Sequence, residues 1–129
     1  MEKTEKVSVN MNIGTLSQID LLVDQGFYSN RSDFINQAVR ESINQKQERI
    51  NEVKTNYEKM NFIWFLGVYR LRYEELMQIK KNGNTKKISG YGILYIDDSL
   101  DDLVLETINT INVKGKVICS DKLKEHFDL

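Results

Sequence analysis

The sequence contains no proline, and cysteine, histidine and tryptophan each occur only once in its 129 residues. A single cysteine, Cys119, excludes an internal disulfide framework and indicates a reducing compartment. Together with His126 it supplies too few soft ligands for a transition-metal site, which needs three or four such groups. We therefore predict no metal and no cofactor.

Long apolar runs and an excess of one charge are also missing. The most apolar run, Phe62 to Tyr69, is far too short to span a bilayer. The charged stretch from Met1 to Lys6 is not followed by an apolar segment, so no signal peptide is predicted and a cytoplasmic protein is expected. With 18 basic and 19 acidic residues, the chain is no general polyanion binder, and nucleic-acid binding must come from a local arrangement.

What the sequence does contain is a strictly alternating segment from Lys6 to Met11. Val7 and Val9 would face one way and the polar residues between them the other, which is the period of a strand with one apolar face. A lone strand of this length is unstable in water, and no hairpin partner follows it. We therefore predict that it pairs with the same strand of a second copy, leaving a polar face that fits the DNA major groove.

Two helices are predicted after this strand. Asn12 is a suitable N-cap for the first helix, and Gly26 is placed to end it. After a short turn, Asn30 is a suitable N-cap for the second helix, with Asp33 in the capping-box position. Apolar residues at heptad spacing then continue, so one long helix is predicted from about Asn30 to about Glu58.

Beyond Asn61, strand-like and helix-like segments alternate. Each of three predicted strands contains a glycine and is followed by a short helix, so three strand–helix units are expected to build a repeat-like layered core. The strands are predicted at 62–69, 91–96 and 113–118, the helices at 73–79, from a cap at 97–99 to about 110, and after Ser120, and the glycines are Gly67, Gly92 and Gly115.

The predicted fold class is α+β with two domains. Residues 1–60 form the DNA-binding and dimerisation domain, which is an intertwined strand–helix–helix dimer with an extended second helix. Residues 61–129 form a small α/β domain that oligomerises the protein or binds an effector.

The N-terminal segment resembles the ribbon-helix-helix family of bacterial, archaeal and phage DNA-binding proteins, the CopG/Arc/MetJ type. The resemblance covers residues 5–47. It rests on the strand Lys6–Met11 and on the segment from Gly26 to Ile35 with its sequence GFYSNRSDFI, which is similar to the family's "G-x-Y-S-x-R-S-E-F-I" turn and helix start. It implies an obligate dimer with an antiparallel two-stranded ribbon.

By match of position, the resemblance implies that Lys6, Ser8 and Asn10 point into the major groove. Serine and asparagine can form hydrogen bonds to base edges, and asparagine pairs well with adenine. The ribbon has one cation where the family usually has two or three. This weakens the electrostatic contribution that dominates affinity, so several dimers are expected to bind together.

The resemblance also implies a phosphate contact at the start of the second helix, by Asn30, Arg31 and Ser32. Free amides and the helix dipole favour an anion there. Ordinary capping is the alternative interpretation. The pair Asn36-Gln37 stands where an arginine often follows in the family, which again weakens the expected affinity.

The layout of this N-terminal unit before an α/β domain also resembles the nickel-responsive regulators of the family. The metal is not carried over, because those proteins use several histidines with a cysteine. Cys119 and His126 as a metal or nucleophile pair are the less favoured interpretation, and a buried inert thiol is the favoured one.

Other side chains have competing interpretations. The acidic cluster could hold a cation or act as paired catalytic carboxylates, but helix capping at the positive end of a dipole is preferred. The Trp64 stretch could line a ligand pocket or an oligomer interface, and core packing is favoured. No phosphate-cradling loop, nucleophile elbow or metal motif is present, so no enzyme is predicted. The acidic cluster consists of Asp97, Asp98, Asp101 and Asp102.

The sequence therefore predicts a transcriptional regulator that acts as a repressor, with double-stranded DNA and further copies of itself as partners. An antitoxin that represses its own operon is the second interpretation within DNA binding. A structural or assembly protein that uses the ribbon fold only for dimerisation is the alternative from another class, and there the C-terminal domain would bind the partners.

Overall fold

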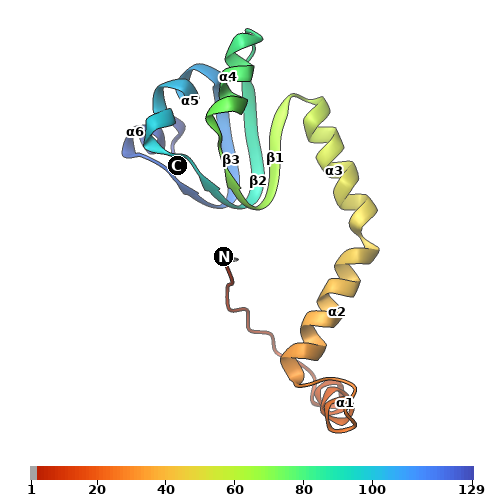
Figure 1. Ribbon diagram of the computed structural model, residues 1–129. Coiled ribbons are helices and arrows are strands. Elements are labelled where there is room, and N and C mark those ends of the chain that lie inside the picture. The colour runs from red at the N-terminus through yellow and green to blue at the C-terminus, as the bar shows by residue number, and fades with distance from the viewer. Residues whose placement is uncertain (1–2) are drawn as a thin grey trace. The chain divides into compact units, whose positions relative to one another are not determined.

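The computed structural model describes residues 3–129 and divides the chain into two units, the first ending at Glu48 and the second beginning at Arg49 (Figure 1). The first unit is helical, and the second holds a sheet with helices. The boundary predicted from the sequence lies after residue 60. The structure instead groups most of helix α3 (Gln47–Lys59) with the sheet unit.

The first unit contains helices α1 (Ile13–Asp24) and α2 (Arg31–Gln45), and each begins at the predicted N-cap. The Asn12 side chain accepts hydrogen bonds from two backbone amides of the first turn of α1, at 2.8 and 3.4 Å. The Asn30 side chain accepts one at 2.8 Å from the amide three residues later. Gly26 ends α1 with a φ of +84°, a conformation that glycine adopts without steric cost.

The residues of the first unit that the structure describes, 3–48, bury almost no apolar side chain. Among its described residues only Ile19 is buried, at 3% exposure. Val7, Val9 and Phe27 are 78, 76 and 71% exposed. So many exposed large apolar side chains in one small unit indicate a surface where another surface docks. Helices α1 and α2 add further exposed apolar side chains: Ile13, Leu21, Ile35, Val39 and Ile43.

The long second helix predicted from the sequence is wrong, because the structure ends α2 at Gln45 and begins α3 at Gln47. At Lys46 the backbone leaves helical geometry, with φ −104° and ψ 6°, and its amide donates to the carbonyl of Ile43 over three residues instead of four. Every residue from 44 to 49 is polar, so no apolar contact holds this turn in register. The heptad spacing on either side could not reveal the interruption.

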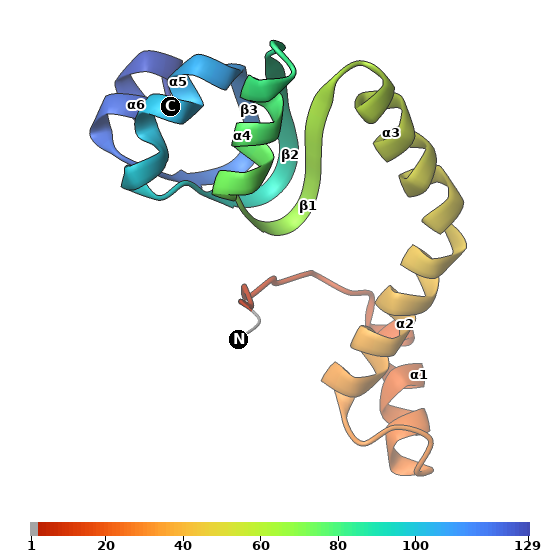
Figure 2. The ribbon, with the colours of Figure 1, turned by 45° about the horizontal axis from the view of Figure 1, so that its top comes forward.

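The second unit holds three strands, β1 (Phe62–Arg70), β2 (Lys86–Tyr95) and β3 (Ile108–Ile118). They form a parallel sheet in the order β1-β2-β3, with the connecting helices on one face (Figure 2). β2 starts before the predicted strand, and β3 starts at 108 where a helix was predicted to continue. Isoleucines at 108 and 111, β-branched and buried in the ladder, explain the earlier start. The helical elements are α4 (Tyr73–Lys81), the 3₁₀ turn η1 (Asp98–Leu100), α5 (Asp101–Thr107) and α6 (Asp121–Phe127).

One core unites these elements. Leu76 of α4, Val104 of α5 and Leu123 of α6 are each 0% exposed, and they face buried strand residues. Because each helix contributes its apolar stripe to the same face of the sheet, the opposite face has no helical layer from α4, α5 or α6. The buried strand residues are Phe65, Ile88, Leu94, Ile108 and Ile111.

The predicted glycine repeat is a physical row across the sheet. Gly67 lies opposite Gly92, and Gly92 lies opposite Gly115, in the parallel register. All three have positive φ, at +89, +122 and +146°. A Cβ on Gly92 would lie 2.0 Å from the Gly67 carbonyl oxygen, and a Cβ on Gly115 would lie 2.0 Å from that of Gly92. The strands approach so closely here that only glycine fits.

Candidate nucleic-acid interface

The predicted ribbon segment carries neither helix nor strand from residue 3 to residue 12 in this structure of a single chain. The side chains of Lys6, Ser8 and Asn10, predicted to contact bases, are all exposed. So are those of Val7 and Val9 between them. A strand is defined by its pairing, and the predicted partner is a second chain, so the ribbon itself stays a prediction.

The N-terminus of α2 is capped by side chains. The Asn30 side chain accepts from the amide of Asp33, and the Asp33 carboxylate accepts from the amide of Ser29 at 2.9 Å. The Gln37 side chain also donates to the Asp33 carboxylate, at 2.9 Å. The hydrogen bond from Ser29 and, after it, the one from Gln37 lower the pKa of Asp33 below its usual range. Helix geometry still leaves the amides of Arg31 and Ser32 without intrahelical acceptors.

A side-chain pair across the turn fixes Arg31. Its Nε lies 2.8 Å from Asp20 Oδ1 and its second guanidinium nitrogen lies 2.9 Å from Asp20 Oδ2, a two-point contact between α1 and α2. The hydrogen bond with the guanidinium lowers the pKa of Asp20 and raises that of Arg31. Sequence reasoning missed this pair, because the partners are eleven residues apart and no local pattern joins them.

Charge near the predicted DNA contacts is sparse. Residues 1–48 include five cations and seven acids, and one of those cations, Arg31, is already paired with Asp20. Phosphate contacts normally supply most of the affinity for DNA. The first unit alone therefore offers little electrostatic attraction to DNA, which agrees with the single cation predicted for the ribbon.

The acidic cluster of the second unit makes structural contacts. Asp97 caps η1, accepting from the Ser99 amide at 2.9 Å, as the capping interpretation predicts. Asp101 accepts from the Ser120 hydroxyl at 2.6 Å, and Lys122 lies 3.1 Å from Asp102. These two contacts join the start of α5 to the start of α6. No three His, Cys, Asp or Glu side chains within residues 3–129 are arranged to hold a metal ion.

The single cysteine and the single histidine have different surroundings. Cys119 is half-buried against the core, and this burial raises the pKa of its thiol. His126 packs edge-on against the ring of Phe127 at 4.7 Å between centroids. An unreactive, largely protonated thiol is the expected result at neutral pH.

The Trp64 stretch divides between the two faces of the sheet. Phe65 is 4% exposed in the core, as core packing predicts. Trp64 lies on the other face, where Tyr57 of α3 stacks on it at 6.1 Å between centroids and meets Phe62 edge-on at 5.1 Å. The end of α3 therefore covers this corner of the sheet.

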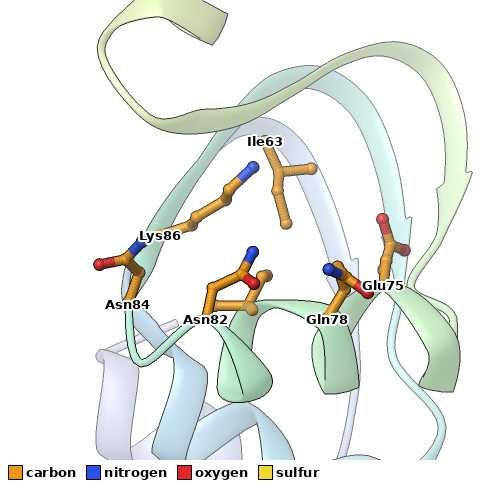
Figure 3. Close-up of a pocket in the computed structure, with 7 residues that line it drawn as sticks. Ile63, Glu75, Gln78, Asn82, Asn84 and Lys86 are labelled. Carbon is orange, nitrogen blue, oxygen red and sulfur yellow. The ribbon is translucent and has the colours of Figure 1, made fainter.

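A small pocket opens between α4 and the sheet, near the start of β1 and β2 (Figure 3). The side chains of Asn82, Asn84 and Lys86 lie toward one end of it. Glu75 at its far end is occupied, because it accepts from the Tyr69 hydroxyl at 2.5 Å. Burial and this hydrogen bond raise the pKa of Tyr69 to about 12. The rest of the lining is largely apolar, from Ile63 and Ile79, so the pocket combines a few amides, one ammonium group and one engaged carboxylate with a wall of the core.

No helix in residues 3–129 is long and apolar enough to cross a membrane. Comparison with curated proteins finds no match, and comparison with solved structures finds none either. The sequence profile of the ribbon-helix-helix transcriptional regulator family matches residues 2–124, which span both units. The two capped helices, the glycine-ended turn and the preceding alternating segment agree with that match. The chain therefore belongs to the ribbon-helix-helix transcriptional regulator family.

Proposed function

We propose that this protein is a sequence-specific DNA-binding repressor that acts as a dimer and reads the major groove with a two-stranded antiparallel ribbon. The observation that carries the proposal is the uncovered apolar surface of the first unit. Val7 and Val9 are more than three-quarters exposed, and only Ile19 among the described residues of the unit is buried.

Dimerisation explains this surface. Pairing two copies of the segment from Lys6 to Met11 gives their backbone N–H and C=O groups hydrogen-bond partners. It also turns Val7, Val9 and Met11 of both chains to one side. The exposed faces of α1 and α2 then cover that side and form the core that a single copy lacks. Burial of each such side chain contributes about 1.5–3 kcal/mol, which together offsets the cost of ordering the segment.

The opposite face of the ribbon then carries Lys6, Ser8 and Asn10 from each chain. A two-stranded ribbon has the width of the major groove, where each base pair shows a distinct set of donors and acceptors. Among these side chains, Asn10 is the one best suited to two hydrogen bonds with one adenine. Arg31 and Ser32 lie at a helix N-terminus, where two free amides favour a phosphate.

Replacing Asn10 by alanine tests base reading. The variant is expected to bind a selected operator about 10- to 100-fold more weakly, because each good two-point base contact contributes about 1–3 kcal/mol of discrimination. Its affinity for unrelated duplex DNA should stay near that of the unchanged protein, because phosphate contacts remain. Titration of labelled operator and scrambled duplexes measures both values.

The matched control is Asn56→Ala, which removes the same side chain from an exposed position on α3. It should leave both affinities unchanged. Sedimentation of Asn10→Ala should report the same dimer as the unchanged protein. A variant that keeps its preference for the operator would refute the assignment of Asn10 to base contact.

The second candidate is a regulator whose main partner is a protein, such as an antitoxin that represses its own operon. The folded core of the second unit argues against a tail that wraps a toxin, because a wrapping tail leaves its apolar residues uncovered until it binds. Leu76, Ile88, Leu94, Val104 and Leu123 are instead fully buried within this chain. The second unit is better suited to oligomerisation or to binding an effector.

A further inference from the structure

The strands of the second unit carry charge of one sign. Their residues include five cations and no aspartate or glutamate. All twelve acidic residues after position 48 lie on helices or in loops. The sheet is thus locally basic in a chain whose net charge is −1. The strand cations are Arg70, Lys86, Lys87, Lys114 and Lys116.

Four of these cations share the face of the sheet that α4, α5 and α6 leave uncovered, which we call the open face. Strand alternation sets it, because the buried residues Phe65, Ile88 and Leu94 face the helices and their neighbours face away. Its side chains are those of Phe62, Trp64, Leu66, Val68 and Arg70 on β1, Lys87, Ser89, Tyr91, Ile93 and Tyr95 on β2, and Asn112, Lys114, Lys116 and Ile118 on β3.

The centre of the open face is an apolar strip beside a basic edge. Leu66, Tyr91 and Lys114 lie side by side across the three strands, and Val68, Ile93 and Lys116 form the next row. Leu66, Val68 and Tyr91 are 49, 51 and 52% exposed. Each row therefore runs from an aliphatic side chain through the middle strand to a lysine.

Both ends of this strip are bounded by aromatic contacts. At one end Tyr57 of α3 covers Trp64. At the other end the Arg70 guanidinium lies 4.1 Å from the centre of the Tyr95 ring. None of the ion pairs found within residues 3–129 includes Arg70, Lys87, Lys114 or Lys116. Arg70 and Lys87 contact aromatic rings, Lys87 lying 5.7 Å from the centre of the Phe62 ring, and the charges of Lys114 and Lys116 are available to an anionic partner.

We propose that the open face binds single-stranded DNA, a second nucleic-acid site separate from the ribbon. An unpaired base would stack on Tyr91, its sugar would contact Leu66 or Val68, and the neighbouring phosphates would pair with Lys114 and Lys116. Aromatic side chains on a basic surface form the general platform for unpaired strands, because every base has a π-face and every nucleotide a phosphate.

Two other occupants fit less well. A duplex keeps its bases stacked inside, so it would use the lysines and leave the apolar strip and Tyr91 exposed to water. A second open face would bring eight cations toward one another with no acid between them, which disfavours this contact. Single-stranded RNA has the same bases to stack and the same phosphates. We choose DNA over RNA because the chain belongs to a family of transcriptional regulators that act on DNA.

The test uses full-length protein and a labelled 15-nucleotide oligo-dT at near-physiological salt, with fluorescence anisotropy as the readout. The unchanged protein should bind, and affinity should fall as salt rises. The double substitution Lys114→Glu with Lys116→Glu should weaken binding at least about tenfold. Tyr91→Ala should weaken it about tenfold, because one base loses its stacking partner.

The matched control for the charge change is Lys81→Glu with Lys124→Glu, two exposed lysines on α4 and α6. This pair should bind oligo-dT as the unchanged protein does. No binding by the unchanged protein, equal losses in the two charge variants, or tighter binding of an oligo-U RNA or a duplex of equal length would each overturn the proposal. Thermal melting of each variant separates lost binding from lost folding.

The open-face proposal and the ribbon proposal can be refuted independently of each other. Lys114→Glu with Lys116→Glu should leave the preference for a selected operator over scrambled duplex intact. Asn10→Ala should leave oligo-dT binding intact. An open face that binds nothing would therefore leave the proposed repressor function standing, and a ribbon without sequence preference would leave the open-face proposal standing.

Discussion

Replacing Val9 by aspartate is expected to turn the dimer into a monomer. In the proposed ribbon Val9 faces the shared core with its symmetry mate, so the substitution places two carboxylates in an apolar interior. Each carboxylate costs several kcal/mol to desolvate in an apolar interior that offers it no counter-charge. The dimer dissociation constant should rise by about a thousandfold or more.

Sedimentation velocity and circular dichroism measure the outcome. The first unit should lose helix content, because it has no core without its partner. The second unit, which has its own core, should stay folded. Ser8→Asp is the matched control, because it introduces the same charge one residue away on the predicted outer face. That variant should remain a dimer while losing DNA affinity. Two variants that dimerise equally well would contradict the ribbon pairing.

Replacing Gly92 by alanine is expected to unfold the second unit. The new Cβ would lie 2.0 Å from the carbonyl oxygen of Gly67, and φ at this position is +122°. Relief requires the central strand to separate from β1, which breaks the ladder and opens the core beneath it. A loss of about 4 kcal/mol or more in the free energy of unfolding follows, which exceeds the effect of most single substitutions.

Gly83→Ala is the matched control. Gly83 also has positive φ, at +71°, but a Cβ there meets nothing within 4 Å. Only the backbone conformation is penalised, at about 1–2 kcal/mol. Urea unfolding followed by the fluorescence of Trp64, the only tryptophan, reports on the sheet directly. Equal losses for the two variants would show that close approach of the strands is not what requires glycine at position 92.

The features predicted well from the sequence are those with a local physical cause. Asn12, Asn30 and Ser120 cap helices as their positions predict, since each hydrogen bond spans only two or three residues. Gly26 is similar, because a helix end in left-handed conformation needs glycine. The glycine repeat was visible because all three strands use glycine at the same register position with positive φ, and the close approach to a neighbouring carbonyl occurs at Gly92 and Gly115.

The features that escaped prediction depend on distant residues or on a missing contact. Asp20 and Arg31 meet only because the turn brings α1 and α2 together, and neither residue type signals the pair. The break at Lys46 reflects a polar stretch with nothing to pack against, which heptad spacing on either side conceals. The open face emerged only when the sheet register set Lys114 and Lys116 beside Tyr91 and Ile93.

The central claim is that paired ribbons read a DNA sequence. The most direct test is selection of binding sites by the full-length protein from a random duplex DNA pool at near-physiological salt. The account predicts enrichment of a short inverted or tandem repeat, whose half-site spacing reports how the dimers are arranged. A folded, dimeric protein that enriches no sequence would contradict it and would make the second unit and its partners the functional centre of the molecule.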